Sequence, residues 1–310
     1  MLRETFFRFF CQSASVKKIG FFFGCIALWS SDVTAAPPAK AINPLPHYKG
    51  VPLYYWQQQK FVNFGDYLSL LIVERIVGTP VKVHQNYPWN KGKKLLALGS
   101  IMSFAKDHDA VWGTGVNGKL LRKESYHFDA LDVRAVRRPL TRDFLWEHFG
   151  IDAPEIYGDP ALLFPRLFPE FTRSNHPKYP YIIIPHYSEQ VLFPKESGDH
   201  IVYPTDDWDV VIRKILDSEF VISSSLHGII LAEAYGIPAR QLRITENEPQ
   251  FKYRDYYFGT NRFDCQYARS VEEALAMGGE RGVECDLNRL YRAFPFDLWP
   301  ETSIRDDLFE

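Results

Sequence analysis

The chain has 310 residues, of which 46% are hydrophobic and 24% charged, a composition typical of a globular protein with a sizeable core. The formal net charge is -2 at pH 7, and no basic block interrupts the sequence, which argues against nucleic acid as the main partner. The 4 cysteines have no CxxC spacing. A zinc site or a redox pair is therefore not expected, and a reducing compartment fits.

The first 46 residues differ from the rest of the chain. Lys17 and Lys18 precede an apolar run over 19–29, and small residues follow at 34–36, a pattern typical of a signal peptide. The run is short for a membrane span, whereas the aromatic stretch "FFRFF" before it suits an interfacial anchor. A third interpretation is a start assigned too far upstream, with the folded protein beginning near Pro44. All three remain open.

Strands and helices alternate in the first half of the folded region. A strand is predicted over 50–56, and a helix follows, with Asp66 as its N-cap and Gly78 at its end. Short strands are expected within 93–102, 109–117 and 130–138, then a helix over 139–149 and a strand with its loop over 155–165.

A second series begins after a polar, proline-bearing stretch at 171–180, which we interpret as a linker. Its predicted strands lie within 181–189, 200–204, 220–226 and 239–244, and its predicted helices within 206–218, 228–236, 270–279 and 286–294. Such alternation favours parallel sheets with helices on both faces. We therefore expect an α/β fold with a leader (1–46) and two Rossmann-like lobes (47–172 and 178–310), with a ligand cleft between them at the carboxyl ends of the strands.

The segment "SSSLHG" at 223–228 joins a predicted buried strand to a predicted buried helix. Free N–H groups and the helix dipole favour an anion at such a helix start. A histidine is a poor stabiliser there, so a functional role for His227 is as well supported as a structural one. The sequence thus predicts an anion cradle of Ser224, Ser225 and helix N–H groups, with a proton-transfer group beside it.

Other residues near strand ends have two interpretations each. Arg137 and Arg138 lie between a strand and a helix, where guanidinium groups suit phosphate or carboxylate but also occur as surface charges. "NFGD" at 63–66 and Asp159 are explained by a turn and a helix cap, and His186 by an ordinary strand end, unless they face the cleft.

Several enzyme motifs are missing from the sequence. It has no GxGxxG, P-loop, GxSxG or HExxH pattern. Dinucleotide binding, a hydrolase triad and a zinc protease therefore lack support.

The ordered set "NFGD", "LALGS", "WGTGV", "VRAVRRPLTR", "GDPALLFP", "SSSLHGIILAEAYGIPAR" and "KYRDYY" spans residues 50–260. This set resembles the polysaccharide pyruvyl transferase family, especially its exopolysaccharide ketal-pyruvate transferases. The resemblance implies a GT-B-like fold and phosphoenolpyruvate as co-substrate. It also implies formation of a pyruvate ketal on two hydroxyls of a sugar, with a lipid-linked oligosaccharide or polysaccharide as acceptor.

The resemblance places Arg137 and His227 near phosphoenolpyruvate. Together with the strand-end residues, it leads to three sets of expected site residues. They are His227 and Asp159 for catalysis; Arg137, Arg138, Ser224, Ser225 and Gly228 for the donor; and Asn63, Asp66, Gly113, His186 and Tyr253 for the acceptor. The sequence departs from the family pattern at Arg138, where the family commonly has glycine, and at Ser225, where some members have a basic residue. No metal site and no cofactor are predicted, although a divalent metal remains open.

Two other functions fit the two-lobed layout. One is a GT-B glycosyltransferase that uses a sugar nucleotide, and the other is a non-enzymatic periplasmic ligand-binding protein. Phosphoenolpyruvate is cytosolic, so the transferase interpretation favours a cytoplasmic protein, associated with the inner membrane face, over an exported one. The leader leaves export open.

Overall fold

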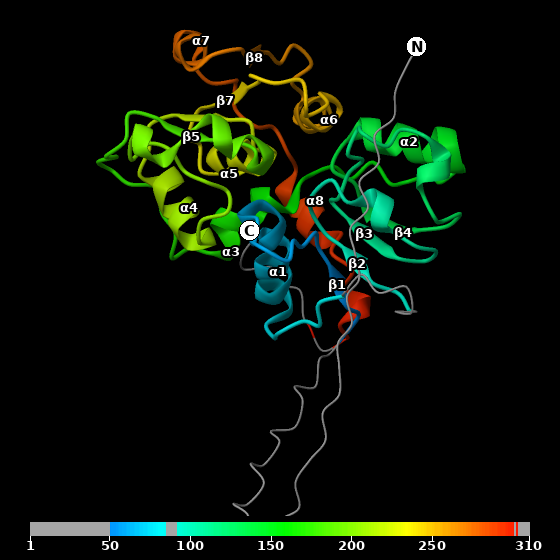
Figure 1. The fold of residues 1–310 in the computed structure, drawn as a ribbon. Coiled ribbons are helices and arrows are strands. Elements are labelled where there is room, and N and C mark those ends of the chain that lie inside the picture. Colours follow the sequence, from blue (N-terminus) through cyan, green and yellow to red (C-terminus); the bar gives the residue numbers. More distant parts are fainter. Residues whose placement is uncertain (1–49, 85–91, 301, 303–310) are drawn as a thin grey trace, which may run out of the picture. The chain divides into compact units, whose positions relative to one another are not determined.

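The computed structural model describes residues 50–84, 92–300 and 302. The expected leader lies outside these residues, as do Cys11 and Cys25. The described chain contains two four-stranded parallel sheets, each with its strands in sequence order (Figure 1). The first sheet consists of β1 (Leu53–Tyr54), β2 (Leu95–Leu96), β3 (Ala110–Trp112) and β4 (Asp132–Ala135). The second consists of β5 (Ile182–Ile184), β6 (Val221–Ser223), β7 (Ala239–Leu242) and β8 (Tyr267–Ala268).

Helices connect the strands, so the predicted α/β class with two parallel sheets is confirmed. The α-helices are α1 (Phe64–Val77), α2 (Pro139–Phe149), α3 (Phe164–Leu167), α4 (Trp208–Leu216), α5 (Leu226–Ala234), α6 (Phe251–Phe258), α7 (Val271–Met277) and α8 (Leu287–Arg292). Short 3-10 helices are η1 (Met102–Phe104), η2 (Lys123–Ser125), η3 (Pro160–Leu163), η4 (Tyr187–Leu192), η5 (Lys195–Ser197) and η6 (Phe296–Leu298).

Both sheets are buried on both faces. Alternate residues of a strand point to opposite sides, so one strand can contribute to two hydrophobic clusters. In the first sheet, Leu53 and Leu95 face one hydrophobic cluster and Leu96 faces another. In the second sheet, Ile182 belongs to the cluster that contains Leu53, while Ile183 belongs to a third. One apolar core is therefore shared by the two sheets, and each sheet has a separate core on its other face.

The segment that carries α8 returns to the first sheet. The Trp112 indole Nε1 donates to the carbonyl of Leu290 at 2.9 Å, and the Trp112 ring lies edge-to-face against Phe294, with ring centroids 4.9 Å apart. In Figure 1 this segment (red) accordingly lies beside β3, whereas α7 (orange) lies beside β8. The end of the chain thus packs on the sheet that the start of the described chain forms.

Some local predictions were wrong. The N-cap of α1 is Asn63, whose side chain accepts from the Gly65 N–H at 3.0 Å, so Asp66 is freed from capping and lies inside the first turn. Helix α5 begins at Leu226 instead of Gly228, and α6 was not predicted because its tyrosine-rich sequence has little helical amphipathicity. The predicted strands at 155–165 and 200–204 form only isolated bridges, through Tyr157 and Ile201.

Candidate active site

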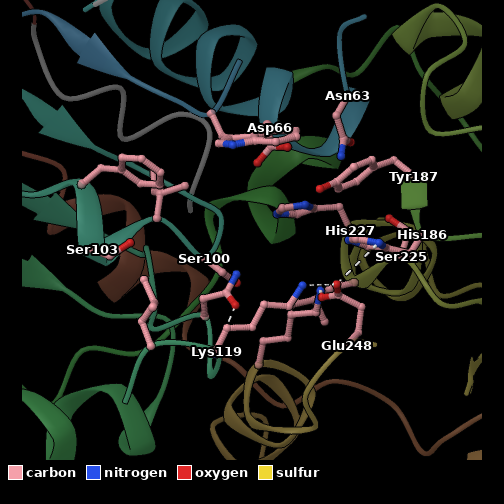
Figure 2. A pocket seen from close by; sticks show the side chains of 17 residues that line it. Asn63, Asp66, Ser100, Ser103, Lys119, His186, Tyr187, Ser225, His227 and Glu248 are labelled. Atoms are coloured by element: carbon pink, nitrogen blue, oxygen red, sulfur yellow. Dashed lines mark hydrogen bonds and ion pairs between the residues drawn. The ribbon is translucent and has the colours of Figure 1, made fainter. Parts of the chain in front are cut away.

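A cavity of about 390 Å³ lies where loops from both sheets meet. Most of its walls come from residues that follow strand ends, which is where ligands bind in parallel α/β sheets. Figure 2 shows Asp66 and Asn63 on one side, Lys119 and Glu248 on the other, and His227 between them. The lining residues are Trp56, Asn63, Asp66, Ser100, Ile101, Ser103, Phe104, Asn117, Lys119, Leu120, His186, Tyr187, Ser225, Leu226, His227, Glu248 and Lys252.

His227 lies in the first turn of α5, directly after β6. Only 9% of the residue is exposed, and the exposed part opens on the cavity. Gly65 in the first turn of α1 lets the ring approach, because a Cβ at that position would lie 2.4 Å from His227 Nδ1. The glycine of "NFGD" thus has a specific purpose, which is to let the start of α1 pack against this imidazole.

Two of the three serines before His227 stabilise the loop. The Ser223 hydroxyl donates to the carbonyls of Ile184 and Ser225, at 2.7 and 2.8 Å. The Ser224 hydroxyl accepts from the His186 N–H at 2.8 Å. Ser225 differs, since its hydroxyl does not cap α5 and lies on the cavity wall. Of the residues predicted to form an anion cradle, Ser225 and the start of α5 therefore line the cavity, whereas Ser224 does not.

Two carboxyl groups interact with His227, those of Asp159 and Asp66. Asp159 Oδ2 lies 3.7 Å from His227 Nε2, too far for a hydrogen bond, and neither atom has another hydrogen-bond partner among the described residues. Burial raises the pKa of Asp159, but His227, the Ala161 N–H and Arg137 outweigh it, so the net shift is downward. Asp159 is therefore a carboxylate at neutral pH, able to attract a proton on His227.

Asp66 is the second carboxylate. Burial raises the pKa of Asp66 to about 6, and the charges of His227 and Lys252 oppose that rise. A carboxyl group that titrates near neutrality can both accept and donate a proton under working conditions. The imidazole therefore lies beside one ionised carboxylate, Asp159, and shares the cavity with a second carboxyl group, Asp66, whose pKa is raised.

A charged cluster of Lys119, Lys252, Glu248 and His186 forms the opposite wall. Lys119 Nζ donates to Glu248 Oε1 at 2.6 Å, and Lys252 donates to the other carboxylate oxygen. Burial lowers the pKa of Lys252, and the charge of Glu248 opposes this. Burial also lowers the pKa of His186 to about 3, aided by the two lysines and opposed by Glu248, so His186 is neutral at pH 7. Two ammonium groups against one carboxylate leave this wall with a net positive charge.

Arg137 lies behind the cavity wall and is not among its lining residues. Its side chain is fully buried and pairs with Asp255 of α6 at 3.1 Å. Its other guanidinium nitrogens donate to Ser100 Oγ at 2.8 Å and to the Val116 carbonyl at 3.0 Å. Arg137 thus links the end of β4 to α6, and its predicted donor-binding role would require these contacts to change.

Arg138 is also fully buried. Its Nη1 donates to the Gly259 carbonyl, and its guanidinium carbon lies 5.5 Å from the centre of the Tyr256 ring. The side chain therefore packs against α6 away from the cavity lining, although its Nε and Nη2 atoms have no hydrogen-bond partner among the described residues.

Three more expected site residues lie outside the lining. Gly113 has φ +91°, and a Cβ there would lie 2.3 Å from Pro160 Cδ, so this glycine lets the Asp159–Pro160 turn approach β3. Gly228 packs against the end of β6 and Ile184. Tyr253 is buried, and its hydroxyl donates to the Ser224 carbonyl at 2.6 Å, so its ring has no open face toward the cavity.

The structure thus brings together Asn63, Asp66, His186, Ser225 and His227 as cavity residues, with Asp159 beside His227. Sequence reasoning missed Trp56, Tyr187, Lys119, Glu248 and Lys252. A signal existed for Lys252, which lies in the quoted "KYRDYY" segment, and for Tyr187, which follows His186. Lys119 and Glu248 lie several residues beyond their strands, so local sequence did not reveal them.

Two searches of residues 50–84, 92–300 and 302 were negative. None of the helices there is long and apolar enough to span a membrane. None of the His, Cys, Asp and Glu side chains there form a group of three or more with metal-binding geometry.

The fold and site together define an α/β protein with a cavity that suits an anion and a hydroxyl-bearing ligand. The family model "Polysaccharide pyruvyl transferase" matches residues 63–240, more than half of the chain. An uncharacterised protein of Acanthamoeba polyphaga mimivirus is 31% identical over 229 residues, which cover 70% of this chain and 77% of the viral protein. The "Succinoglycan biosynthesis protein ExoV" of Rhizobium meliloti (strain 1021) is 30% identical over 213 residues, which cover 66% of this chain and 63% of that protein.

The chain therefore belongs to the polysaccharide pyruvyl transferase family, and the expected resemblance is confirmed. Membership makes the protein an enzyme of pyruvyl transfer. This assignment takes the place of the two alternatives, a glycosyltransferase and a non-enzymatic binding protein.

Proposed function

We propose that the enzyme transfers the pyruvyl group of phosphoenolpyruvate onto two hydroxyls of one sugar in an exopolysaccharide repeat unit, and that the repeat is lipid-linked during the reaction. The observation that carries this proposal is the position of His227. It lies at the start of α5, beside Asp159, in a cavity that is also lined by Asp66 and two lysines. The printed function of the Rhizobium meliloti relative, succinoglycan biosynthesis, supports the polymer class.

The donor would bind between the start of α5 and the part of the cavity wall formed by Lys119, Lys252 and Glu248, which we call the lysine wall. Phosphoenolpyruvate carries a phosphate and a carboxylate, which require N–H donors and cations. The start of α5 and the Ser225 hydroxyl supply donors, and Lys252 and Lys119 supply charge. These lysines would provide the cation that some family members have at the position of Ser225.

His227 would act as the general acid/base. Ketal formation begins when a proton is delivered to the methylene carbon of phosphoenolpyruvate, which leaves an oxocarbenium ion at the adjacent carbon. One sugar hydroxyl adds to that carbon, the phosphate departs, and the second hydroxyl closes the ring. Of the two hydroxyl protons, one balances the new methyl group and the other leaves with phosphate. An imidazole beside Asp159 can carry such protons between steps.

Asn63, Asp66 and His186 would orient the acceptor. Asp66 is suited to remove a hydroxyl proton because its pKa lies at about 6. The remaining amide N–H groups of Asn63 and the neutral imidazole of His186 can form hydrogen bonds with sugar hydroxyls. The acceptor would therefore contact the α1 side of the cavity and His186, and the donor would contact Lys119 and Lys252.

The two sheets and the cavity between their carboxyl ends support a GT-B-like arrangement, which we propose for this chain. Because the donor is cytosolic, we further propose that the enzyme acts at the cytoplasmic face of the inner membrane. Lysines and helix N–H groups would supply positive potential at the donor in this scheme.

The proposal is tested by proton NMR of phosphoenolpyruvate with depyruvylated exopolysaccharide as acceptor. We expect the vinyl signals of phosphoenolpyruvate to decay while a ketal methyl singlet and inorganic phosphate appear. Replacing His227 by Asn should abolish this conversion, whereas the exposed His176→Asn variant should retain it. Vinyl signals that persist in the presence of wild-type enzyme and acceptor, with no ketal methyl signal, would contradict the proposal.

A further inference from the structure

Three aromatic side chains form a connected group at one end of the cavity, which we call the aromatic platform: Trp56, Phe61 and Tyr187. The Trp56 and Tyr187 ring centroids are 5.3 Å apart, those of Phe61 and Tyr187 5.7 Å, and those of Trp56 and Phe61 6.5 Å. Trp56 follows the first sheet's β1 and Tyr187 follows the second sheet's β5. The platform is therefore assembled from both halves of the described chain.

The exposure of the platform distinguishes it from the tyrosines of α6. Tyr253, Tyr256 and Tyr257 are at most 1% exposed and belong to the core. Trp56 and Tyr187, in contrast, are only partly buried, and both line the cavity. Rings kept partly open at a binding cavity offer flat apolar faces to a ligand, with the polar tip of tyrosine available for a hydrogen bond.

Polar groups border the platform where a sugar would need them. Figure 2 shows Tyr187 beside Asn63, with His227 and His186 close by. The His186 and Tyr187 ring centroids are 4.5 Å apart, which joins the platform to the wall that carries Glu248. A pyranose ring has the matching character, since its C–H groups form an apolar face and its hydroxyls form a polar rim.

We propose that the aromatic platform is the acceptor subsite, which holds one pyranose ring of the polysaccharide by its C–H face and presents its hydroxyls toward Asn63, Asp66 and His227. This inference rests on the proposed function and names the residues that select a ring-shaped acceptor. The donor, which has no ring, gains nothing from the platform. Substitutions there should separate acceptor binding from donor binding.

The experiment is saturation-transfer-difference NMR of the full chain with methyl hexopyranosides of gluco, galacto and manno configuration. Sorbitol serves as a hydroxylated probe without a ring face. We expect saturation of the pyranoside ring C–H protons, with little saturation of sorbitol. Trp56→Ala and Tyr187→Ala should weaken pyranoside affinity about three- to tenfold. Trp56→Phe should retain most of it, and Trp146→Ala on α2, 59% exposed and outside the cavity lining, should leave it unchanged.

Phosphoenolpyruvate affinity, measured by calorimetry on the same variants, separates the two proposals and checks that each variant is folded. Unchanged donor affinity with weakened pyranoside binding supports the platform. Unchanged pyranoside saturation in both alanine variants, or equal saturation of sorbitol, would overturn the platform and leave the proposed function standing. Platform-dependent pyranoside binding without any phosphoenolpyruvate binding by the wild type would contradict the proposed donor and leave the sugar subsite standing.

Discussion

Two junctions between a strand and the helix that follows it, one in each sheet, do different things: one follows β6 and the other follows β4. The junction between β6 and α5 places His227 and Ser225 on the cavity wall. The junction between β4 and α2 contains Arg137 and Arg138, both 0% exposed. Arg137 bonds to Asp255 of α6, and Arg138 bonds to Gly259, the residue after α6. A strand-to-helix junction thus contributes to the cavity wall in one sheet and to an internal connection in the other.

The difference depends on which acceptors the neighbouring elements offer. Asp255 of α6 is fully buried and accepts from Arg137, the Thr141 N–H and the Thr141 hydroxyl. Among the described residues, no comparable acceptor satisfies His227 Nε2, which faces Asp159 at 3.7 Å. Because α6 also carries Lys252, the arginine junction is suited to position a cavity residue without touching the ligand. The charge of Arg137 at the end of β4 is therefore accounted for by its internal partner, Asp255, whereas His227 Nε2 has no such partner among the described residues.

The strongest test of the histidine junction is His227→Asn. Loss of the general acid/base should lower kcat by about 10²- to 10⁴-fold, because an amide cannot transfer the proton. Phosphate release from phosphoenolpyruvate with acceptor present measures the effect, and circular dichroism checks the fold. A variant with more than about a tenth of wild-type turnover would rule out this role.

The arginine junction is tested by Asp255→Ala, which leaves the guanidinium of Arg137 buried without its counter-ion. We expect a loss of about 3–5 kcal/mol in the free energy of unfolding. The matched control is Asp152→Ala, whose pair with Arg142 is exposed and should contribute about 1 kcal/mol or less. Urea denaturation measures both variants. Equal, small effects would mean that the buried pair does not connect β4 to α6.

The lysine wall contains one buried cation, Lys252, and one exposed cation, Lys119, which should contribute differently to donor binding. Lys252→Met should weaken phosphoenolpyruvate binding by about 10- to 100-fold, the range for losing a hydrogen bond to a charged group. The side chain of Lys119 is 51% exposed, so Lys119→Met should cost only a few-fold. Calorimetric titration gives both constants. The reverse order would move the donor toward the exposed lysine.

The smallest expected effect concerns pH. Burial raises the pKa of Asp66 to about 6, above its unfolded value of about 3.9. The folded state therefore binds more protons between these values, and wild-type stability falls as pH rises through about 6. An asparagine side chain at this position does not titrate. As pH rises from about 4 to about 8, the free energy of unfolding of Asp66→Asn should therefore increase by about 2 kcal/mol relative to that of wild type. Urea denaturation at both pH values measures this gain, and the exposed Asp264→Asn variant, as control, should not show it. Absence of the gain in Asp66→Asn as well would mean that Asp66 is not desolvated.

The sequence predicted the parallel sheets well because most of their strands are apolar runs and several helices have recognisable ends, as at Gly78 and Pro139. It also indicated His227, Ser225 and Asp66, because the chain brings strand ends together at one edge of a parallel sheet. It could not show that Arg137 meets Asp255, 118 positions away, or that Trp56 meets Tyr187. Such pairings depend on long-range packing, which single-sequence patterns do not contain.

The central claim is that the cavity at the start of α5 holds phosphoenolpyruvate. Its most direct test is calorimetric titration of wild type and Ser225→Glu with phosphoenolpyruvate, and with UDP-glucose as a nucleotide-sugar control. The Ser225 hydroxyl does not cap the helix, so the substitution adds a negative charge to the cavity wall without removing a structural hydrogen bond. The account predicts phosphoenolpyruvate binding to wild type that Ser225→Glu abolishes, with no UDP-glucose binding. Undiminished phosphoenolpyruvate binding by Ser225→Glu would contradict it.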